Sequence, residues 1–447
     1  MRSEQPKVLH TILDRPLIGY PLALCDDVKI SHKVVVVGEG REAVEACVTR
    51  LDSSAQFALQ PEARGTADAV RSALDQTQGF DTVLILSGDV PGLSAATVEA
   101  LLLTFQQSNA PLAIVGFEPA DPTGYGRLVM EDDAVIAIVE EGDANPQQRD
   151  IGVVNAGIYA ADQAFLARAL AQIDTNNAQG EFYLTDLAKL AAQAGTPAPV
   201  IITADASEVQ GINDRAELAA ATAMLRNRRN TSLAHEGVTL LDPDTTYVGW
   251  DVHIQSDVTL SPHVSLHGQT TIGAQTTIGQ GAVLTHVIVG SKVTIKPYCV
   301  VTESTLSDGA TIGPFAHLRP GTVLGEGAKI GNFVETKKAV VGAGSKASHL
   351  TYLGDCELGE GVNVGAGTIT CNYDGTHKHR TRIEDGVFVG SNTAIVAPAT
   401  IGENAVIGAG TTITKDVPAD ALALSRSPQT NVEGWAARKR RNDGAEE

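Results

Sequence analysis

The second half of the chain repeats an aliphatic residue, often followed by glycine, about every six positions. The repeat begins near Ile272 and runs, with interruptions, to Ile407. This period is typical of short strands joined by tight corners, in which each inward side chain stacks on the one a coil above. Glycine suits the corners because it adopts conformations that other residues avoid. The pattern therefore predicts a parallel β-helix.

The length and net charge of the chain limit its number of domains and its possible partners. A chain of 447 residues is too long for one ordinary domain and long enough for two cores. The net charge of −20 argues against a nucleic-acid partner, because phosphate binding needs a basic face. No apolar run approaches about eighteen residues and no signal segment opens the chain, so we expect a soluble cytoplasmic protein without a membrane partner. The five cysteines show no paired metal-type spacing, which favours reduced thiols.

The first half predicts an α/β domain. Residues 34–38 and 82–87 are short apolar runs of the kind that fill a parallel sheet covered on both faces. Residues 65–70 open an amphipathic helix between them. Asp89 follows the second run, at the carboxyl end of a strand, where ligands sit in open α/β sheets. We therefore expect a Rossmann-like, doubly wound nucleotide-binding domain.

The predicted domain organisation has four parts. Residues 1–213 form the nucleotide-binding domain, and residues 214–236 form a linker helix because they are rich in Ala, Leu and Arg and lack proline. Residues 237–428 form the β-helix. Residues 429–447 form a tail whose mixed-charge end we expect to be disordered, since it offers little to bury.

The segments that interrupt the repeat carry the chemically interesting side chains. Arg319 and Lys337 are either solvated surface charges or a cationic pair for a sugar phosphate, which gains from charge-assisted hydrogen bonds. His349 is either an exposed loop histidine or a general base for an attacking amine. The glycine-rich run at residues 365–375 is either a turn or a source of amide donors for an oxyanion.

In the first half Asp89 is the best metal candidate. Mg²⁺ favours one or two protein oxygens together with substrate phosphates, and Asn213 is the candidate for a second ligand. Either residue alone is more often a cap or turn residue. Residues 121–127 are a loop whose glycines would let the backbone approach a ring or a phosphate.

Three segments occur in a telling order: Gly-Pro-Phe-Ala-His-Leu-Arg-Pro-Gly at 313–321, His-Leu-Thr-Tyr-Leu-Gly-Asp at 349–355, and Gly-Ala-Gly-Thr-Ile-Thr-Cys-Asn-Tyr-Asp-Gly at 365–375. The chain resembles, over essentially its whole length, the GlmU family of bifunctional enzymes. These enzymes join an N-acetylglucosamine-1-phosphate uridylyltransferase to a glucosamine-1-phosphate N-acetyltransferase. The resemblance implies a left-handed β-helix, a homotrimer with acetyl-transfer sites where subunits meet, and synthesis of UDP-N-acetylglucosamine for cell-wall precursors.

For the β-helix domain the resemblance implies direct transfer of acetyl from acetyl-CoA to the amine of glucosamine 1-phosphate, without a covalent enzyme intermediate. It makes His349 the base, oriented by Glu335, and places Asn372 at the thioester and its oxyanion. The implied binding residues are Arg319 and Lys337 for the phosphate, Tyr352 and Asn363 for the sugar, and Ala366, Asn372, Tyr373, Ser391, Ala409 and Arg426 for acetyl-CoA.

For the first domain the resemblance implies attack by N-acetylglucosamine 1-phosphate on the α-phosphorus of UTP, with pyrophosphate leaving. Positioning and charge stabilisation supply most of such catalysis. Asp89 and Asn213 are implied to hold Mg²⁺. The other implied residues are Lys7 for phosphate, Gln60, Gly65 and Thr66 for uracil, and Gly126, Glu140 and Asn155 for the amino sugar and ribose end.

The chain departs from the family pattern at its start. Members carry a buried strand and a Leu-Ala-Ala-Gly-x-Gly-Thr-Arg-Met loop before the segment that matches residues 2–7, and Met1 coincides with the end of that loop. We therefore expect a truncated first domain without the phosphate-cradling amides of that loop. Either the true start lies upstream, or the protein keeps only acetyl transfer. A third alternative, an inert β-helical rod, would not need His349 with Arg319, Lys337 and Asn372.

Overall fold

The structure is a computed structural model that describes residues 1–443. The chain forms two compact units, residues 1–228 and the part of the chain from residue 229 onward. Helix α8 (Arg215–His235) lies where the sequence predicts a linker helix, and the division falls within it.

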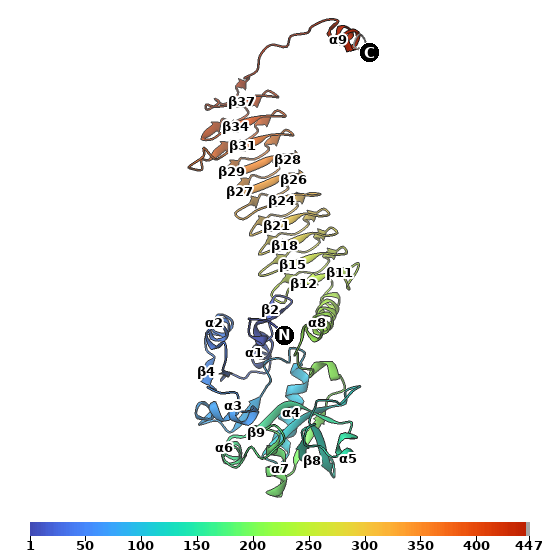
Figure 1. The fold of residues 1–447 in the computed structure, drawn as a ribbon. Coiled ribbons are helices and arrows are strands. Elements are labelled where there is room, and N and C mark those ends of the chain that lie inside the picture. The colour runs from blue at the N-terminus through green and yellow to red at the C-terminus, as the bar shows by residue number, and fades with distance from the viewer. Residues whose placement is uncertain (444–447) are drawn as a thin grey trace. The chain divides into compact units, whose positions relative to one another are not determined.

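A six-stranded mixed sheet, of which β8 and β9 are labelled in Figure 1, forms the centre of the first unit. Its strand order is β5-β9-β6-β10-β8-β7. Strand β10 is parallel to β6, whereas β5, β6 and β7 are antiparallel to β9. The strands are β5 (Thr82–Ile85), β6 (Leu112–Phe117), β7 (Arg127–Glu131), β8 (Ala134–Val139), β9 (Val154–Asp162) and β10 (Ala198–Ile202). The helices are α1 (Gly19–Asp27), α2 (Arg41–Leu51), α3 (Thr66–Ser72), α4 (Ala95–Gln107), α5 (Pro146–Arg149), α6 (Gln163–Leu170) and α7 (Asp186–Gln193), with the 3-10 turns η1 (Lys7–Leu9), η2 (Leu74–Thr77) and η3 (Ala206–Glu208).

The core of this sheet follows from its apolar runs. All six residues of β6 are buried, as expected of a central strand covered on both faces. Ser94 caps the N-terminus of helix α4, because its hydroxyl accepts a hydrogen bond from the amide of Thr97. Its Val98 and Leu101, three residues apart and so on one helix face, are completely buried.

One expectation about this unit is wrong. Residues 34–38 and 82–87 do not share a parallel sheet. Strand β3 (Val34–Val37) pairs with β4 (Gln56–Leu59) in a separate two-stranded sheet, and β5 forms the edge of the six-stranded sheet. Within residues 1–443 no strand pairs between β3 and β5, so each keeps one open edge. A short hairpin of β1 (Thr11–Ile12) and β2 (Arg15–Pro16) completes the unit.

The second unit confirms the predicted left-handed parallel β-helix, whose coils stack along one axis (Figure 1). One face consists of β11 (Thr239–Leu240), β14 (Thr259–Leu260), β17 (Thr277–Ile278), β20 (Thr294–Ile295), β23 (Thr311–Ile312), β26 (Lys329–Asn332), β28 (Lys346–His349), β30 (Asn363–Val364), β33 (Phe388–Val389), β36 (Val406–Ile407) and β38 (Leu422–Ala423).

A second sheet continues over the other two faces, because β27 (Glu335–Val341) and β29 (Tyr352–Leu358) run round the corner between them. One of these faces also holds β12 (Tyr247–Val248), β15 (Ser265–His267), β18 (Val283–Thr285), β21 (Val300–Thr302), β24 (His317–Leu318), β31 (Ile369–Cys371), β34 (Ala394–Val396) and β37 (Thr412–Ile413). The other also holds β13 (His253–Ile254), β16 (Thr271–Ile272), β19 (Ile288–Val289), β22 (Thr305–Leu306), β25 (Val323–Leu324), β32 (Thr381–Ile383) and β35 (Ala399–Ile401).

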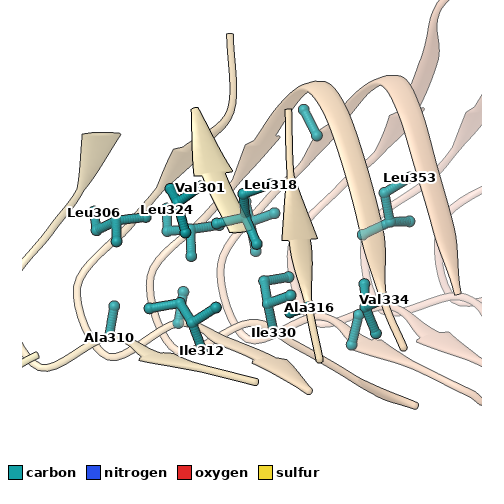
Figure 2. Packing of buried hydrophobic residues seen from close by; sticks show 14 of the residues in the cluster. Val301, Leu306, Ala310, Ile312, Ala316, Leu318, Leu324, Ile330, Val334 and Leu353 are labelled. Carbon is teal, nitrogen blue, oxygen red and sulfur yellow. The ribbon is translucent and has the colours of Figure 1, made fainter. Parts of the chain in front are cut away.

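The strand register gives the length of a coil. Leu266 pairs with Leu284 and Leu284 with Val301, which are 18 and 17 residues apart, so three six-residue repeats make one turn. Inward residues therefore stack on like residues. Figure 2 shows this for the buried pairs Val301 with Leu318 and Ile312 with Ile330. Removing these aliphatic rows from water supplies the main stabilisation of the unit.

One coil is interrupted. Cys356 pairs with Thr381, 25 residues on, because residues 372–380 leave the coil between β31 and β32. We call this excursion the 372–380 hairpin, since a bridge between Tyr373 and Lys378 closes it.

Part of the C-terminal tail is helical, which differs from the predicted disorder. Its mixed-charge end was predicted to be disordered, but Trp435–Asp443 forms helix α9. Lys439 lies over the Trp435 ring, 5.6 Å from its centroid, which links two residues one helical turn apart. The last four residues, 444–447, lie outside the described residues. Along residues 1–443 we find no helix with the length and apolar character needed to span a bilayer.

Candidate functional site

Adjacent coils bring three of the predicted sugar-phosphate residues, Arg319, Lys337 and Tyr352, onto one face of the β-helix, whereas Asn363 lies on β30 of the other sheet. Glu335 of β27 is in register with Tyr352 of β29, and Lys337 is in register with Gly354. Arg319, which follows β24, donates a hydrogen bond from a guanidinium nitrogen to Oε1 of Glu335 at 2.7 Å. Arg319 and Glu335 are 37% and 42% exposed, so both remain accessible to a ligand.

A third cation joins this group. The ammonium of Lys378, and after it the guanidinium of Arg319, lower the pKa of Lys337. Like charges disfavour one another's charged forms, so this direction of shift agrees with cations that lie close together. A dianionic phosphate would relieve that repulsion. Lys378 lies in the 372–380 hairpin. The sequence did not predict it as part of this site, because the coil repeat gives no register for an inserted loop.

His349 ends β28, opposite Asn332 of β26 in the strand register. The two side chains are hydrogen bonded, with Nδ1 of His349 2.7 Å from Oδ1 of Asn332. An amide oxygen only accepts, so Nδ1 carries the proton in this pair. The neutral ring then has its free lone pair on Nε2, as a general base requires.

Asn332 rather than Glu335 is therefore the hydrogen-bond partner of His349, in contrast to the expectation. Glu335 is engaged with Arg319. A sequence signal for Asn332 exists, because it precedes His349 by 17 residues, the length of one coil. The signal is visible only after the coil length is known.

Asn372 lies where the coil gives way to the hairpin. Its side chain is 7% exposed, and Nδ2 donates to Oδ2 of Asp355 at 2.5 Å. Beneath the hairpin is a cavity of about 350 Å³, with Lys338, Lys378 and Arg380 among its lining residues. Asp355, the hydrogen-bond partner of Asn372, also lines this cavity, so the predicted oxyanion donor is linked through Asp355 to the cavity that Lys378 borders.

Four of the predicted acetyl-CoA residues, Ala366, Ser391, Ala409 and Arg426, follow one corner of the β-helix over successive coils, whereas Asn372 and Tyr373 lie in the 372–380 hairpin. The carbonyl of Ala366 accepts from the amide of Asn392, and that of Ser391 from the amide of Gly410, at 2.7 and 2.8 Å. The Arg426 guanidinium donates to the carbonyl of Ala409 at 2.8 Å. This row starts one coil beyond His349, because β30, which carries Asn363 and leads to Ala366, pairs with β28. Tyr373, on the hairpin, is 59% exposed, and its hydroxyl donates to the carbonyl of Gly375 at 2.6 Å.

In the first unit, two predicted metal ligands converge on a cation. Asp89 follows β5, and its Oδ2 lies 2.5 Å from Nζ of Lys7. The same ammonium donates to Oδ1 of Asn213 at 3.1 Å. The amide of Ile212 donates to the carbonyl of Asp89 at 3.1 Å, which ties the two segments together. A carboxylate and an amide oxygen within reach of one positive centre fit the small oxygen set of a Mg²⁺ site.

The predicted uracil residues form a second group at the start of α3. Nε2 of Gln60 donates to the carbonyl of Gly65 at 3.2 Å, and the hydroxyl of Thr66 accepts from the amide of Leu184 at 3.0 Å. Gly65 has φ +114°, and a Cβ there would lie 2.5 Å from the carbonyl oxygen of Phe182. Only glycine fits this position.

The predicted amino-sugar residues form a third group. The amide of Asn155 donates to the carbonyl of Gly126 at 2.8 Å, and a Cβ on Gly126 would lie 3.4 Å from the Glu140 carboxylate. Burial raises the pKa of Glu140, against the lowering effect of a hydrogen bond from the Thr185 hydroxyl. Gly126, Glu140 and Asn155 are therefore neighbours, and their binding of the amino sugar and ribose stays a prediction.

Comparison with known proteins decides the family. The chain is 45% identical over 444 residues to the "Bifunctional protein GlmU" of Trichlorobacter lovleyi, covering 99% of this chain and 96% of the relative. The proteins of the same name from Geotalea uraniireducens and Syntrophotalea carbinolica are 47% and 48% identical, over 98% of this chain and 96% and 94% of theirs. The chain belongs to the GlmU family.

Family models agree with the two units. Residues 2–211 match a nucleotidyl transferase model, residues 248–347 a GMPPB C-terminal domain, and residues 380–415 the bacterial transferase hexapeptide with six repeats. As a GlmU-family member the chain is a bifunctional enzyme of acetyl and uridylyl transfer, which confirms the predicted activity class. Nucleotide-sugar chemistry of this kind typically uses a divalent metal.

Proposed function

We propose that the chain acetylates glucosamine 1-phosphate on the β-helix and then uridylylates the product in the first unit, giving UDP-N-acetylglucosamine and pyrophosphate. The observation that carries the first step is the convergence of Arg319, Lys337 and Lys378 on the face that bears Glu335 and Tyr352. A phosphate dianion suits this cation group, and Tyr352 and Asn363 are the proposed sugar contacts.

Acetyl transfer then needs only one proton acceptor. Nε2 of His349, free because Nδ1 is bonded to Asn332, removes a proton from the substrate amine as its nitrogen attacks the thioester carbonyl. The new C–N bond forms, the C–S bond breaks, and coenzyme A leaves as its thiol after taking up a proton. Asn372 is the proposed donor to the oxyanion, and Ala366, Tyr373, Ser391, Ala409 and Arg426 are the proposed contacts of acetyl-CoA.

We infer a homotrimer in which a neighbouring subunit covers this corner. Phe333 and Leu350 follow Asn332 and His349 directly and are 56% and 62% exposed. Large apolar side chains beside a proposed base favour coverage by another protein surface, which would also exclude water from the thioester.

For uridylyl transfer, Asp89 and Asn213 are the proposed Mg²⁺ ligands, and the metal would neutralise charge on the triphosphate. Lys7 already lies between these two oxygens and is the proposed phosphate contact. Gln60, Gly65 and Thr66 would bind uracil, while Gly126, Glu140 and Asn155 would bind the amino sugar and ribose. The sugar-phosphate oxygen attacks the α-phosphorus and the bond to pyrophosphate breaks.

The proposal places the enzyme in the cytoplasm. All five cysteines are free, which suits a reducing compartment.

A direct test supplies glucosamine 1-phosphate, acetyl-CoA, UTP and Mg²⁺ to the full chain and follows the products by chromatography. We expect UDP-N-acetylglucosamine to appear only when all four are present. Formation of free thiol without any nucleotide sugar would overturn the second half of the proposal.

A further inference from the structure

The 372–380 hairpin is held by one carboxylate. Oδ1 of Asp374 accepts hydrogen bonds from the amides of Thr376 and His377 at 2.8 and 2.7 Å. Its Oδ2 accepts from Nε2 of His379 at 2.7 Å. These bonds, with the amide of His377 contributing most, lower the pKa of Asp374 to about 2, so the carboxylate is ionised at neutral pH. One side chain therefore fixes both the tip and the returning strand of the hairpin.

The backbone of the hairpin agrees with this arrangement. The amide of Asp374 donates to the carbonyl of His377 at 3.1 Å, and the amide of His379 donates to the carbonyl of Asn372 at 2.8 Å. Gly375 at the tip has φ +99°, a conformation in which most residues are strained. Nine residues thus adopt a single closed turn outside the β-helical repeat.

This turn joins the two halves of the acetyl-transfer site. Asn372, at its start, is anchored to Asp355 and is the proposed oxyanion donor. Lys378, near its end, lies beside Lys337 and belongs to the proposed phosphate site. Asp374 and His379 have no proposed contact with either substrate, and their hydrogen bond closes the part of the chain that separates Asn372 from Lys378.

We propose that Asp374 and His379 are positioning residues that fix the 372–380 hairpin so that Asn372 meets the acetyl group while Lys378 meets the sugar phosphate. The inference rests on the proposed acetyl transfer. Positioning predicts a distinctive kinetic effect, because one change should weaken the use of two chemically different substrates. Loss of a direct contact would weaken the use of only one.

The test compares Asp374→Ala, Asp374→Asn and His379→Ala with Lys378→Ala in the full chain. Asp308→Ala is the matched control, because Asp308 caps the amide of Ser291 at 2.8 Å on the same β-helix but lies outside the hairpin. Thiol release gives kcat and the KM for each substrate. Thermal unfolding reports the stability of the fold, and hydrogen exchange of the peptide that contains residues 372–380 reports hairpin opening.

We expect Asp374→Ala to raise both KM values by about tenfold, as for the loss of one charge-assisted contact, with an unchanged melting temperature and faster exchange of the hairpin. Asp374→Asn keeps an oxygen for the two amides and should recover part of this loss. Lys378→Ala should raise only the KM for glucosamine 1-phosphate, and Asp308→Ala should raise neither.

Two results would overturn the inference: unchanged KM values and exchange in Asp374→Ala, or a lowered melting temperature with unchanged KM values, which would make Asp374 merely structural. Failure of the proposed function is distinguishable, since the unmodified chain would then release no thiol while the exchange measurement still reports on the hairpin.

Discussion

Replacing Asn332 by alanine tests which residue orients the catalytic base. The change removes the oxygen that accepts from Nδ1 of His349 and leaves the Arg319–Glu335 ion pair in place. Without that acceptor the ring is free to take the other tautomer and to rotate, so fewer molecules present a basic Nε2 to the amine. We expect kcat for acetyl transfer to fall while the KM for glucosamine 1-phosphate stays constant.

The size of the effect follows from the geometry. A neutral hydrogen bond contributes about 0.5–1.5 kcal/mol, which corresponds to about a two- to tenfold change in rate. His349 is exposed in the single chain, so water competes for Nδ1 and the lower part of that range is expected there. Removing the base itself, as in His349→Ala, should cost about 10²–10⁴-fold, the usual contribution of general base catalysis.

Glu335→Gln is the matched control. It weakens the pair with Arg319 without touching Asn332, so the KM for glucosamine 1-phosphate should change and kcat should not. The assay is thiol release from acetyl-CoA over a range of sugar-phosphate concentrations. A loss of kcat in Glu335→Gln with an unaffected Asn332→Ala would refute our assignment and restore Glu335 as the orienting residue.

Three further predictions concern separate parts of the molecule. Lys337→Met should raise the KM for glucosamine 1-phosphate and leave the KM for acetyl-CoA unchanged. An equal rise of both KM values in thiol-release kinetics would contradict the proposal that Lys337 binds the substrate phosphate. Ile330→Ala opens a void in the buried row between Ile312 and Ala347 and should cost about 2–5 kcal/mol in denaturant unfolding of the β-helix, whereas the outward Val323→Ala should cost less than about 0.5 kcal/mol. Asp89→Asn should weaken Mn²⁺ binding measured by electron paramagnetic resonance and raise the Mg²⁺ needed for pyrophosphate release, while unchanged binding would remove Asp89 from the metal site.

The β-helix was predictable because its signal is local and repeated. An inward aliphatic residue such as Ile330 recurs with the period of the strand and corner, and each coil buries the same face. Of the segments that break this period, residues 332–338 supply Asn332, the hydrogen-bond partner of His349, and Lys337 of the proposed phosphate site. Sequence reasoning therefore located this region without knowing the register between coils.

The contacts that the sequence did not predict depend on the register between successive coils. Asn332 meets His349 only because one coil is 17 residues long here, and Lys378 meets Lys337 only because an inserted hairpin folds back over the face. In the first unit the apolar runs of β3 and β5 looked alike, yet they lie in different sheets. Apolar composition predicts that a strand is buried but does not select its partner.

The central claim is that one chain holds two separate active sites, with His349 serving one and Asp89 the other. The most direct measurement assays His349→Ala and Asp89→Asn alone and as a mixture, with glucosamine 1-phosphate, acetyl-CoA, UTP and Mg²⁺ present. We expect neither variant alone to form UDP-N-acetylglucosamine at a substantial rate, and we expect the mixture to form it, because N-acetylglucosamine 1-phosphate made by one variant can be used by the other. A mixture that stays as inactive as its components, or loss of both partial reactions in His349→Ala, would contradict the account.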